Sequence, residues 1–129
     1  MTDAPDRLRI LLVEDNESVR DLTEAMLEEV GARVVSVADA EAALATIDGQ
    51  PFDALLTDLN LPGMSGVALA REAAKRYPKL PIIVASGYAK ATVEELRREL
   101  PDTLFVLAKP YDLDALEKIL GTVVPRGTA

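Results

Sequence analysis

The sequence contains no cysteine and no histidine among its 129 residues. The absence of cysteine excludes disulfide bonds and thiolate metal sites. The absence of histidine excludes histidine-based catalytic triads and histidine-ligated metals. Any metal held by this chain's own side chains would therefore be a hard cation bound through oxygen.

Positive charge is also scarce, because 14 Lys and Arg residues stand against 22 Asp and Glu residues, which gives a formal charge of −8. We expect no nucleic-acid partner, since a phosphate backbone needs a basic protein face. No apolar run approaches the roughly 18 residues of a membrane span, and no secretory signal opens the chain. We therefore expect no membrane partner and a cytoplasmic location.

Aromatic residues make up only 4% of the chain, whereas hydrophobic residues make up 49%. The core should therefore consist of Val, Leu, Ile and Ala, in the single domain that this length favours. We expect a flexible tail over residues 1–7, a domain over 8–121 and a second tail over 122–129.

Short apolar runs, largely unbroken by polar residues, recur at 10–13, 34–37, 54–56, 82–85 and 104–108. Such runs are typical of parallel strands that are covered on both faces. Helical patterns lie between them, so the sequence predicts an α/β fold: a doubly wound, five-stranded parallel sheet with helices on both faces. The common flavodoxin-like strand order for such a fold is 2-1-3-4-5.

Capping residues predict where the helices begin and end. The predicted N-caps are Asn16, Asp39 and Asp112. The predicted stops are Gly31, Gly49, Pro78, Pro101 and Gly121. The apolar residues that share one face of the first helix are Val19, Leu22, Met26 and Val30. The fourth helix is expected over residues 93–100.

Charged and hydroxyl side chains follow the predicted strands. Glu14 and Asp15 follow the first strand, Asp58 ends the third, Ser86 ends the fourth and Lys109 follows the fifth. In the order 2-1-3-4-5 all of them share one edge of the sheet, and ligands bind at that edge, between strands 1 and 3.

Each of these residues taken alone is more often a turn or capping residue, but their convergence on one edge favours shared chemistry. Three neighbouring carboxylates repel one another and raise at least one pKa, a problem that Mg²⁺ removes. An Asp beside the metal can act as a nucleophile towards a phosphoryl group. A Lys ammonium and a hydroxyl would stabilise the phosphoryl oxygens.

Four sequence blocks, LLVEDN, TDLNLPGMSG, VASG and AKP, occur in this order across residues 8–121. In these blocks the chain resembles the receiver domain of two-component response regulators. The resemblance implies that Asp58 accepts a phosphoryl group from the phosphohistidine of a sensor histidine kinase or a histidine phosphotransfer protein. It also implies that the domain acts on no other substrate.

The resemblance assigns roles to other residues of these blocks. Asp15 would bind Mg²⁺ or Mn²⁺ together with Asp58, Glu14 would bind it mostly through water, and the backbone carbonyl of Asn60 would complete the protein ligands. Ser86 would bind the phosphoryl oxygens and shift on activation.

Lys109 would pair with the phosphate, and the Lys109–Pro110 bond would be cis, which costs little before proline. Pro62 and Gly66 would shape the loop that presents Asp58. Gly87 would support the site, and Tyr88 would partly gate water access to the acyl phosphate.

A downstream protein would bind the face formed by the fourth helix, the fifth strand and the fifth helix, and this face could also form a homodimer. Family members often carry an aromatic switch residue three positions before the Lys, where this chain has Val106 with Phe105 beside it. If Phe105 points into the core, the aromatic switch is missing.

Three other functions remain open. A protein-interaction module on the same fold would not be phosphorylated, although such modules usually lose the acids or the Lys that are retained here. A phosphohydrolase similar to the haloacid dehalogenase family would need a DxD pair after the first strand. An FMN binder would need a loop rich in glycine and hydroxyl groups there, whereas this chain has EDNES.

The eight residues after Gly121 leave no room for an output domain, so we expect a single-domain regulator or a piece of a larger protein. The SGYA sequence after the fourth strand resembles receivers of both kinds.

Overall fold

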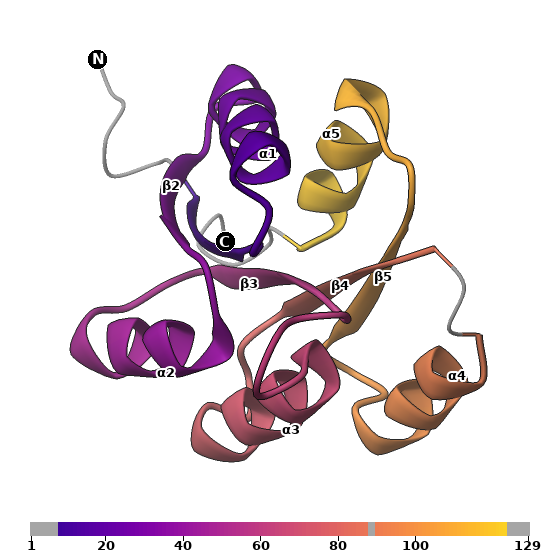
Figure 1. Cartoon of the computed structure of the whole chain (residues 1–129). Helices are drawn as coiled ribbons and strands as arrows, with labels where there is room; N and C mark the ends of the chain where they lie inside the picture. Colours follow the sequence, from indigo (N-terminus) through magenta and orange to yellow (C-terminus); the bar gives the residue numbers. More distant parts are fainter. Residues whose placement is uncertain (1–7, 88–89, 124–129) are drawn as a thin grey trace.

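The computed structural model describes residues 8–87 and 90–123. They form a five-stranded parallel sheet in the order β2-β1-β3-β4-β5, which confirms the predicted fold (Figure 1). The strands are β1 (Arg9–Val13), β2 (Arg33–Val37), β3 (Ala54–Asp58), β4 (Ile82–Ser86) and β5 (Leu104–Ala108). The helices are α1 (Glu17–Glu29), α2 (Ala40–Gly49), α3 (Gly66–Arg76), α4 (Lys90–Glu99) and α5 (Leu113–Val123).

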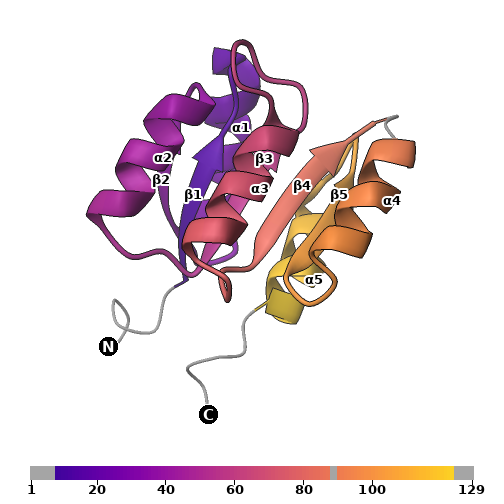
Figure 2. The same cartoon turned by 90° about the horizontal axis from the view of Figure 1, so that it is seen from below.

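Helices cover both faces of the sheet. Helices α1 and α5 lie on one face, and α2, α3 and α4 lie on the other (Figures 1 and 2). All five residues of β3 are buried. Because side chains alternate along a strand, Leu55 packs in the core under α2 and α3, and Leu56 packs in the core under α1 and α5. The continuous apolar runs therefore reflect burial on both faces.

The predicted N-caps are confirmed. The side-chain oxygen of Asn16 accepts the Val19 N–H at 3.0 Å, and Asp39 and Asp112 accept equivalent bonds of 2.8 and 3.0 Å in α2 and α5. Helix α1 also stops as predicted before Gly31, which follows the C-cap residue Val30 and takes a φ of +99° that favours glycine.

Only half of the predicted apolar face of α1 packs against the core, through Met26 and Val30. Val19 and Leu22 are 38% and 60% exposed, whereas Thr23 and Leu27 are the buried residues of this helix. The buried stripe is therefore rotated from the apolar one. A buried threonine can be accommodated because its hydroxyl has a hydrogen-bond partner, Tyr111.

Two helix limits also differ from those predicted. Helix α4 begins at Lys90, three residues before Val93, where the helix was predicted to start. Helix α5 continues through Gly121 to Val123 and so passes the predicted domain limit. A glycine inside a helix costs only about 1 kcal/mol, and burial of Val123, which is 3% exposed, offsets that cost.

Among residues 8–87 and 90–123, no helix has both the length and the apolar character needed to cross a membrane.

Candidate functional site

Three carboxylates meet at the carboxyl-terminal edge of the sheet. Glu14 and Asp15 follow β1 and Asp58 ends β3, and one oxygen from each lies within 4.8 Å of the others. Glu14 and Asp58 are buried, at 5% and 8% exposed, whereas Asp15 is exposed. The predicted acidic cluster is therefore confirmed.

Strand register brings these groups together. Val13 pairs with Thr57, so the next residue of each strand, Glu14 and Asp58, falls at the same level. Asp58 pairs with Ala85 on β4, and Ser86 pairs with Ala108 on β5. Ser86 therefore lies one residue beyond the level of Asp58, and Lys109 lies two residues beyond it, along the same edge, as the strand order predicted.

Asp58 is held from two sides. Lys109 Nζ donates to its Oδ2 at 2.8 Å, and the Asn60 N–H donates to its Oδ1 at 3.1 Å. Burial lowers the pKa of Lys109, but the hydrogen bond and charge of Asp58, with the charge of Glu14, raise that pKa on balance. The ammonium therefore stays charged beside the carboxylate.

Glu14 is the member of the cluster whose charged form is disfavoured. Burial raises its pKa, the Asn16 N–H at 3.1 Å lowers it, and the charge of Asp58 raises it again, so the net shift is upward. One lysine thus faces three acids in the cluster. Carboxylate oxygens at this spacing are the donor set of a hard divalent cation, so the residues fit such an ion.

The loop after Asp58 folds back tightly on the strand. The Gly66 N–H donates to the Leu59 carbonyl at 3.0 Å. A Cβ on Gly66 would lie 1.9 Å from the Asp58 carbonyl oxygen, so only glycine fits this backbone approach. Pro62 lies exposed in the same loop. The backbone geometry of Gly66 thus agrees with the loop-shaping role predicted for it.

Ser86, Gly87 and Val106 line a groove of about 470 Å³ between the ends of β4 and β5 and helix α4. Phe105 packs against the opposite core, under α1 and α5. Phe105 therefore cannot take the place of the missing aromatic residue at position 106, because the sheet separates the two side chains. Tyr88 lies outside the described residues, so its gating role stays a prediction.

A larger groove, of about 1010 Å³, opens between α1 and the segment that joins β5 to α5. The residues that line it are Val19, Leu22, Thr23, Met26, Asn60, Gly87, Lys109, Pro110 and Tyr111. The Lys109–Pro110 bond in its wall is cis, as predicted. This groove was missed from the sequence, because periodicity placed Val19 and Leu22 on one helix face without showing that they are exposed.

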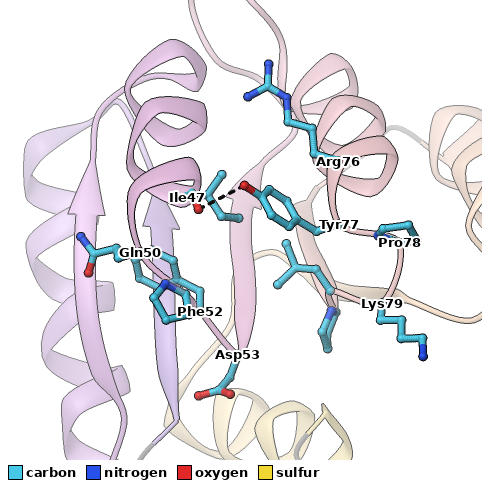
Figure 3. A pocket seen from close by; sticks show the side chains of 11 residues that line it. Ile47, Gln50, Phe52, Asp53, Arg76, Tyr77, Pro78 and Lys79 are labelled. Atoms are coloured by element: carbon cyan, nitrogen blue, oxygen red, sulfur yellow. Dashed lines mark hydrogen bonds between the residues drawn. The ribbon is translucent and has the colours of Figure 1, made fainter.

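Another pocket, of about 570 Å³, lies at the opposite, amino-terminal edge of the sheet, between the ends of α2 and α3 (Figure 3). Phe52 and Tyr77 form part of its wall, and Asp53 lies at one end. The Asp53 carboxylate accepts the Arg9 N–H at 2.8 Å. Among the residues that line it, this pocket has no cluster of acids like the one around Asp58, so it lacks the oxygen donors that a hard cation needs.

Known proteins are similar to this chain in sequence and in fold. Residues 10–121 match the family described as the response regulator receiver domain. The chain is 37% identical over 118 residues to Sensor protein TorS of Escherichia coli (strain K12), covering 89% of this chain and 13% of TorS. It is 34% identical over 116 residues to the response regulator receiver protein CpdR of Brucella abortus (strain 2308), covering 87% of this chain and 96% of CpdR.

The chemotaxis response regulator CheY4 of Vibrio cholerae has the same fold, with a TM-score of 0.81 and 26% identity over 92% of this chain and 99% of that one. The chain spans only a small part of TorS. The acidic cluster, the strand order and these similarities agree, and this chain belongs to the response regulator receiver domains, the phosphoacceptor domains of two-component signalling.

Proposed function

We propose that Asp58 is the residue that accepts the phosphoryl group. The observation that carries this assignment is the 2.8 Å contact between Asp58 Oδ2 and Lys109 Nζ beside two further carboxylates. A buried aspartate with a lysine and acidic neighbours suits a nucleophile whose product carries additional negative charge.

In the transfer, a carboxylate oxygen of Asp58 forms a bond to phosphorus while the phosphorus–nitrogen bond of the donor's phosphohistidine breaks. The departing imidazole nitrogen keeps the electron pair of that bond. Lys109, whose Nζ donates to Asp58 before the transfer, would pair with a phosphoryl oxygen after it. Ser86 lies one step beyond Ala85 along the same edge, and its hydroxyl would donate to another phosphoryl oxygen.

Mg²⁺ or Mn²⁺ would be held by Asp15 and Asp58, with Glu14 acting mostly through water and Asn60 through its carbonyl. When bound, the ion would neutralise the acids and the oxygens of the transferred group. The oxygen-only donor set supports this choice of metal.

Activation would reach a downstream protein through the face formed by α4, β5 and α5. Ser86 and Val106 share the groove beneath α4, so a shift of Ser86 towards a phosphoryl group would change the packing there. Without an aromatic switch, the movement would depend on Ser86 and on the segment that follows it. The same face could form a homodimer, which the molecular mass in solution with and without phosphorylation would test.

The phosphohistidine donor, a sensor histidine kinase or a histidine phosphotransfer protein, would dock in the groove beside α1. Leu22 is 60% exposed there, and Lys109 lines the same groove. A helix that covered this apolar surface would bring its phosphohistidine to Asp58.

We propose that the phosphoryl transfer takes place in the cytoplasm, which cell fractionation tests. We also propose that the domain acts on no other substrate, which assays with small phosphate esters test.

Incubation with acetyl phosphate and Mg²⁺, followed by intact mass measurement, tests the acceptor role. The wild type should gain one phosphoryl group, and Asp58→Asn should gain none. If the folded wild type gained no phosphoryl group from acetyl phosphate or a phosphohistidine donor, the alternative of an unphosphorylated interaction module would be favoured instead.

A further inference from the structure

We propose, on the basis of the phosphoacceptor role proposed above, that the hydrogen bond between Thr23 and Tyr111 positions Lys109 at Asp58. Thr23 Oγ1 and Tyr111 Oη are 3.0 Å apart and join α1 to the segment between β5 and α5. Tyr111 follows Lys109 by two residues, with Pro110 between them. Thr23 and Tyr111 are therefore positioning residues that act through the lysine.

The lysine is fixed on its other side by the sheet. The Lys109 N–H donates to the Ser86 carbonyl at 3.0 Å, which continues the pairing of β4 with β5. Beyond Lys109 the chain leaves the sheet, and the contact of Tyr111 with α1 is the next polar anchor among the described residues. Loss of that anchor would leave the segment after Lys109 held only by packing of the Tyr111 ring against the core, with no polar contact to fix its position.

Because the bond is buried, it restricts the position of the segment that carries Tyr111. Thr23 is 1% exposed, so its hydroxyl depends on Tyr111 for a partner that can replace solvent. A buried hydroxyl that loses its partner costs free energy, which disfavours displaced positions of the segment. Reaction rates are sensitive to small displacements of a group that meets the reacting atoms, and Lys109 is such a group.

The bond also lies in the wall of the groove in which the phosphohistidine donor would dock. Thr23, Tyr111 and Lys109 all line that groove. A partner bound against α1 would therefore contact the Thr23–Tyr111 pair that positions Lys109. Docking of the donor and the position of Lys109 at Asp58 would be coupled through this hydrogen bond.

The test compares Thr23→Val, Tyr111→Phe and the double variant, each of which removes a hydroxyl with little change in shape. Initial rates of phosphorylation are measured at saturating acetyl phosphate and Mg²⁺. Each single variant should react about fivefold more slowly, the factor that a hydrogen bond of typical net strength represents. The double variant should be no slower than either single variant, since all three lose the same bond.

Matched variants separate positioning from simple stabilisation. Thr23→Ser keeps the hydroxyl and should restore the wild-type rate. Tyr77→Phe removes a tyrosine hydroxyl bond of 2.6 Å to Asp48 at the far edge of the sheet and should leave the rate unchanged. The Mg²⁺ affinity should be the same in every variant, because neither Thr23 nor Tyr111 belongs to the acidic cluster.

Wild-type rates in Thr23→Val and Tyr111→Phe, at whatever thermal stability, would overturn the positioning role. Rate losses that add in the double variant would also overturn it. A wild-type protein that accepts no phosphoryl group would instead overturn the proposed function, so the two failures are distinguishable.

Discussion

The acidic side chains at the two ends of the sheet have opposite surroundings. At the amino-terminal edge the Asp53 carboxylate accepts the Arg9 N–H, and Asp48 accepts bonds from Arg76 Nη1 at 2.5 Å and from Tyr77 Oη at 2.6 Å. Each of these acids has its own donor. The edge is thus arranged as a stable structure requires, with each acid paired locally: Asp53 with a backbone N–H, and Asp48 with a guanidinium and a hydroxyl.

At the carboxyl-terminal edge, by contrast, Glu14, Asp15 and Asp58 lie together and the pKa of Glu14 is raised by burial and by Asp58. Only Lys109 among the described residues forms an ion pair with this cluster. Such an arrangement is unfavourable for the isolated fold, and functional sites are where proteins retain such costs. The difference between the edges indicates where a cation and a phosphoryl group would act.

Gly66→Ala should break the carboxyl-terminal edge most severely. The new Cβ would lie 1.9 Å from the Asp58 carbonyl oxygen, a backbone atom that cannot move aside. We expect the free energy of unfolding to fall by about 3 kcal/mol, measured by urea denaturation. In the control Gly121→Ala nothing lies within 4 Å of the added Cβ, and stability should rise by about 1 kcal/mol. Equal effects at the two positions would contradict the tight loop.

Lys109→Ala should slow phosphorylation by acetyl phosphate about 100-fold, since removing one charged donor to a developing anion has effects of this size. Lys79→Ala is the matched control, because Lys79 lines the pocket at the amino-terminal edge. That variant should react at the wild-type rate. A similar loss in both variants would mean that the charge of the whole protein matters and the 2.8 Å contact does not.

Asp15→Asn should weaken the binding of Mg²⁺ while the fold persists. At ten times its dissociation constant, the ion should stabilise the wild type by about 1.4 kcal/mol, which thermal unfolding with and without Mg²⁺ measures. The variant should gain less from the same concentration, accept phosphate more slowly, and be at least as stable as the wild type without the ion. Unimpaired phosphorylation of Asp15→Asn would count against its role as a ligand.

Glu14→Gln should give the smallest change, a gain in stability at neutral pH without Mg²⁺. The folded pKa of Glu14 is raised, so the folded state binds this proton more tightly than the unfolded state does. That contribution is fully present below the unfolded pKa and is lost as the pH rises through the folded pKa. The advantage of Gln should therefore shrink on acidification across that window, in urea denaturation at a series of pH values. Asp53→Asn, at the paired edge, should lower stability at neutral pH instead.

Much of this site could be predicted from the sequence because its determinants are local. The predicted site residues lie at the ends of apolar runs, with Thr57 between one such run and Asp58, and the strand order then places Asp58 and Lys109 on one edge. The cap at Asn16 and the stop at Gly31 depend on residues within one helical turn. Such features need no knowledge of distant contacts.

The rest depended on contacts between distant residues. Periodicity found the apolar stripe of α1, but the buried stripe includes Thr23, whose partner Tyr111 is 88 positions away. Helix α5 continues past Gly121 because Val123 packs in the core. The pairs that settle the amino-terminal edge, such as Arg76 with Asp48, also join separate helices.

The most direct measurement locates the phosphoryl group itself. After incubation with acetyl phosphate and Mg²⁺, the acyl phosphate is reduced with borohydride, and the altered residue is found by peptide mass spectrometry. The modification should fall on Asp58 alone. Modification of Asp48 or Asp53 at the opposite edge, or of no aspartate in a folded protein, would contradict the assignment of the acceptor to the acidic cluster.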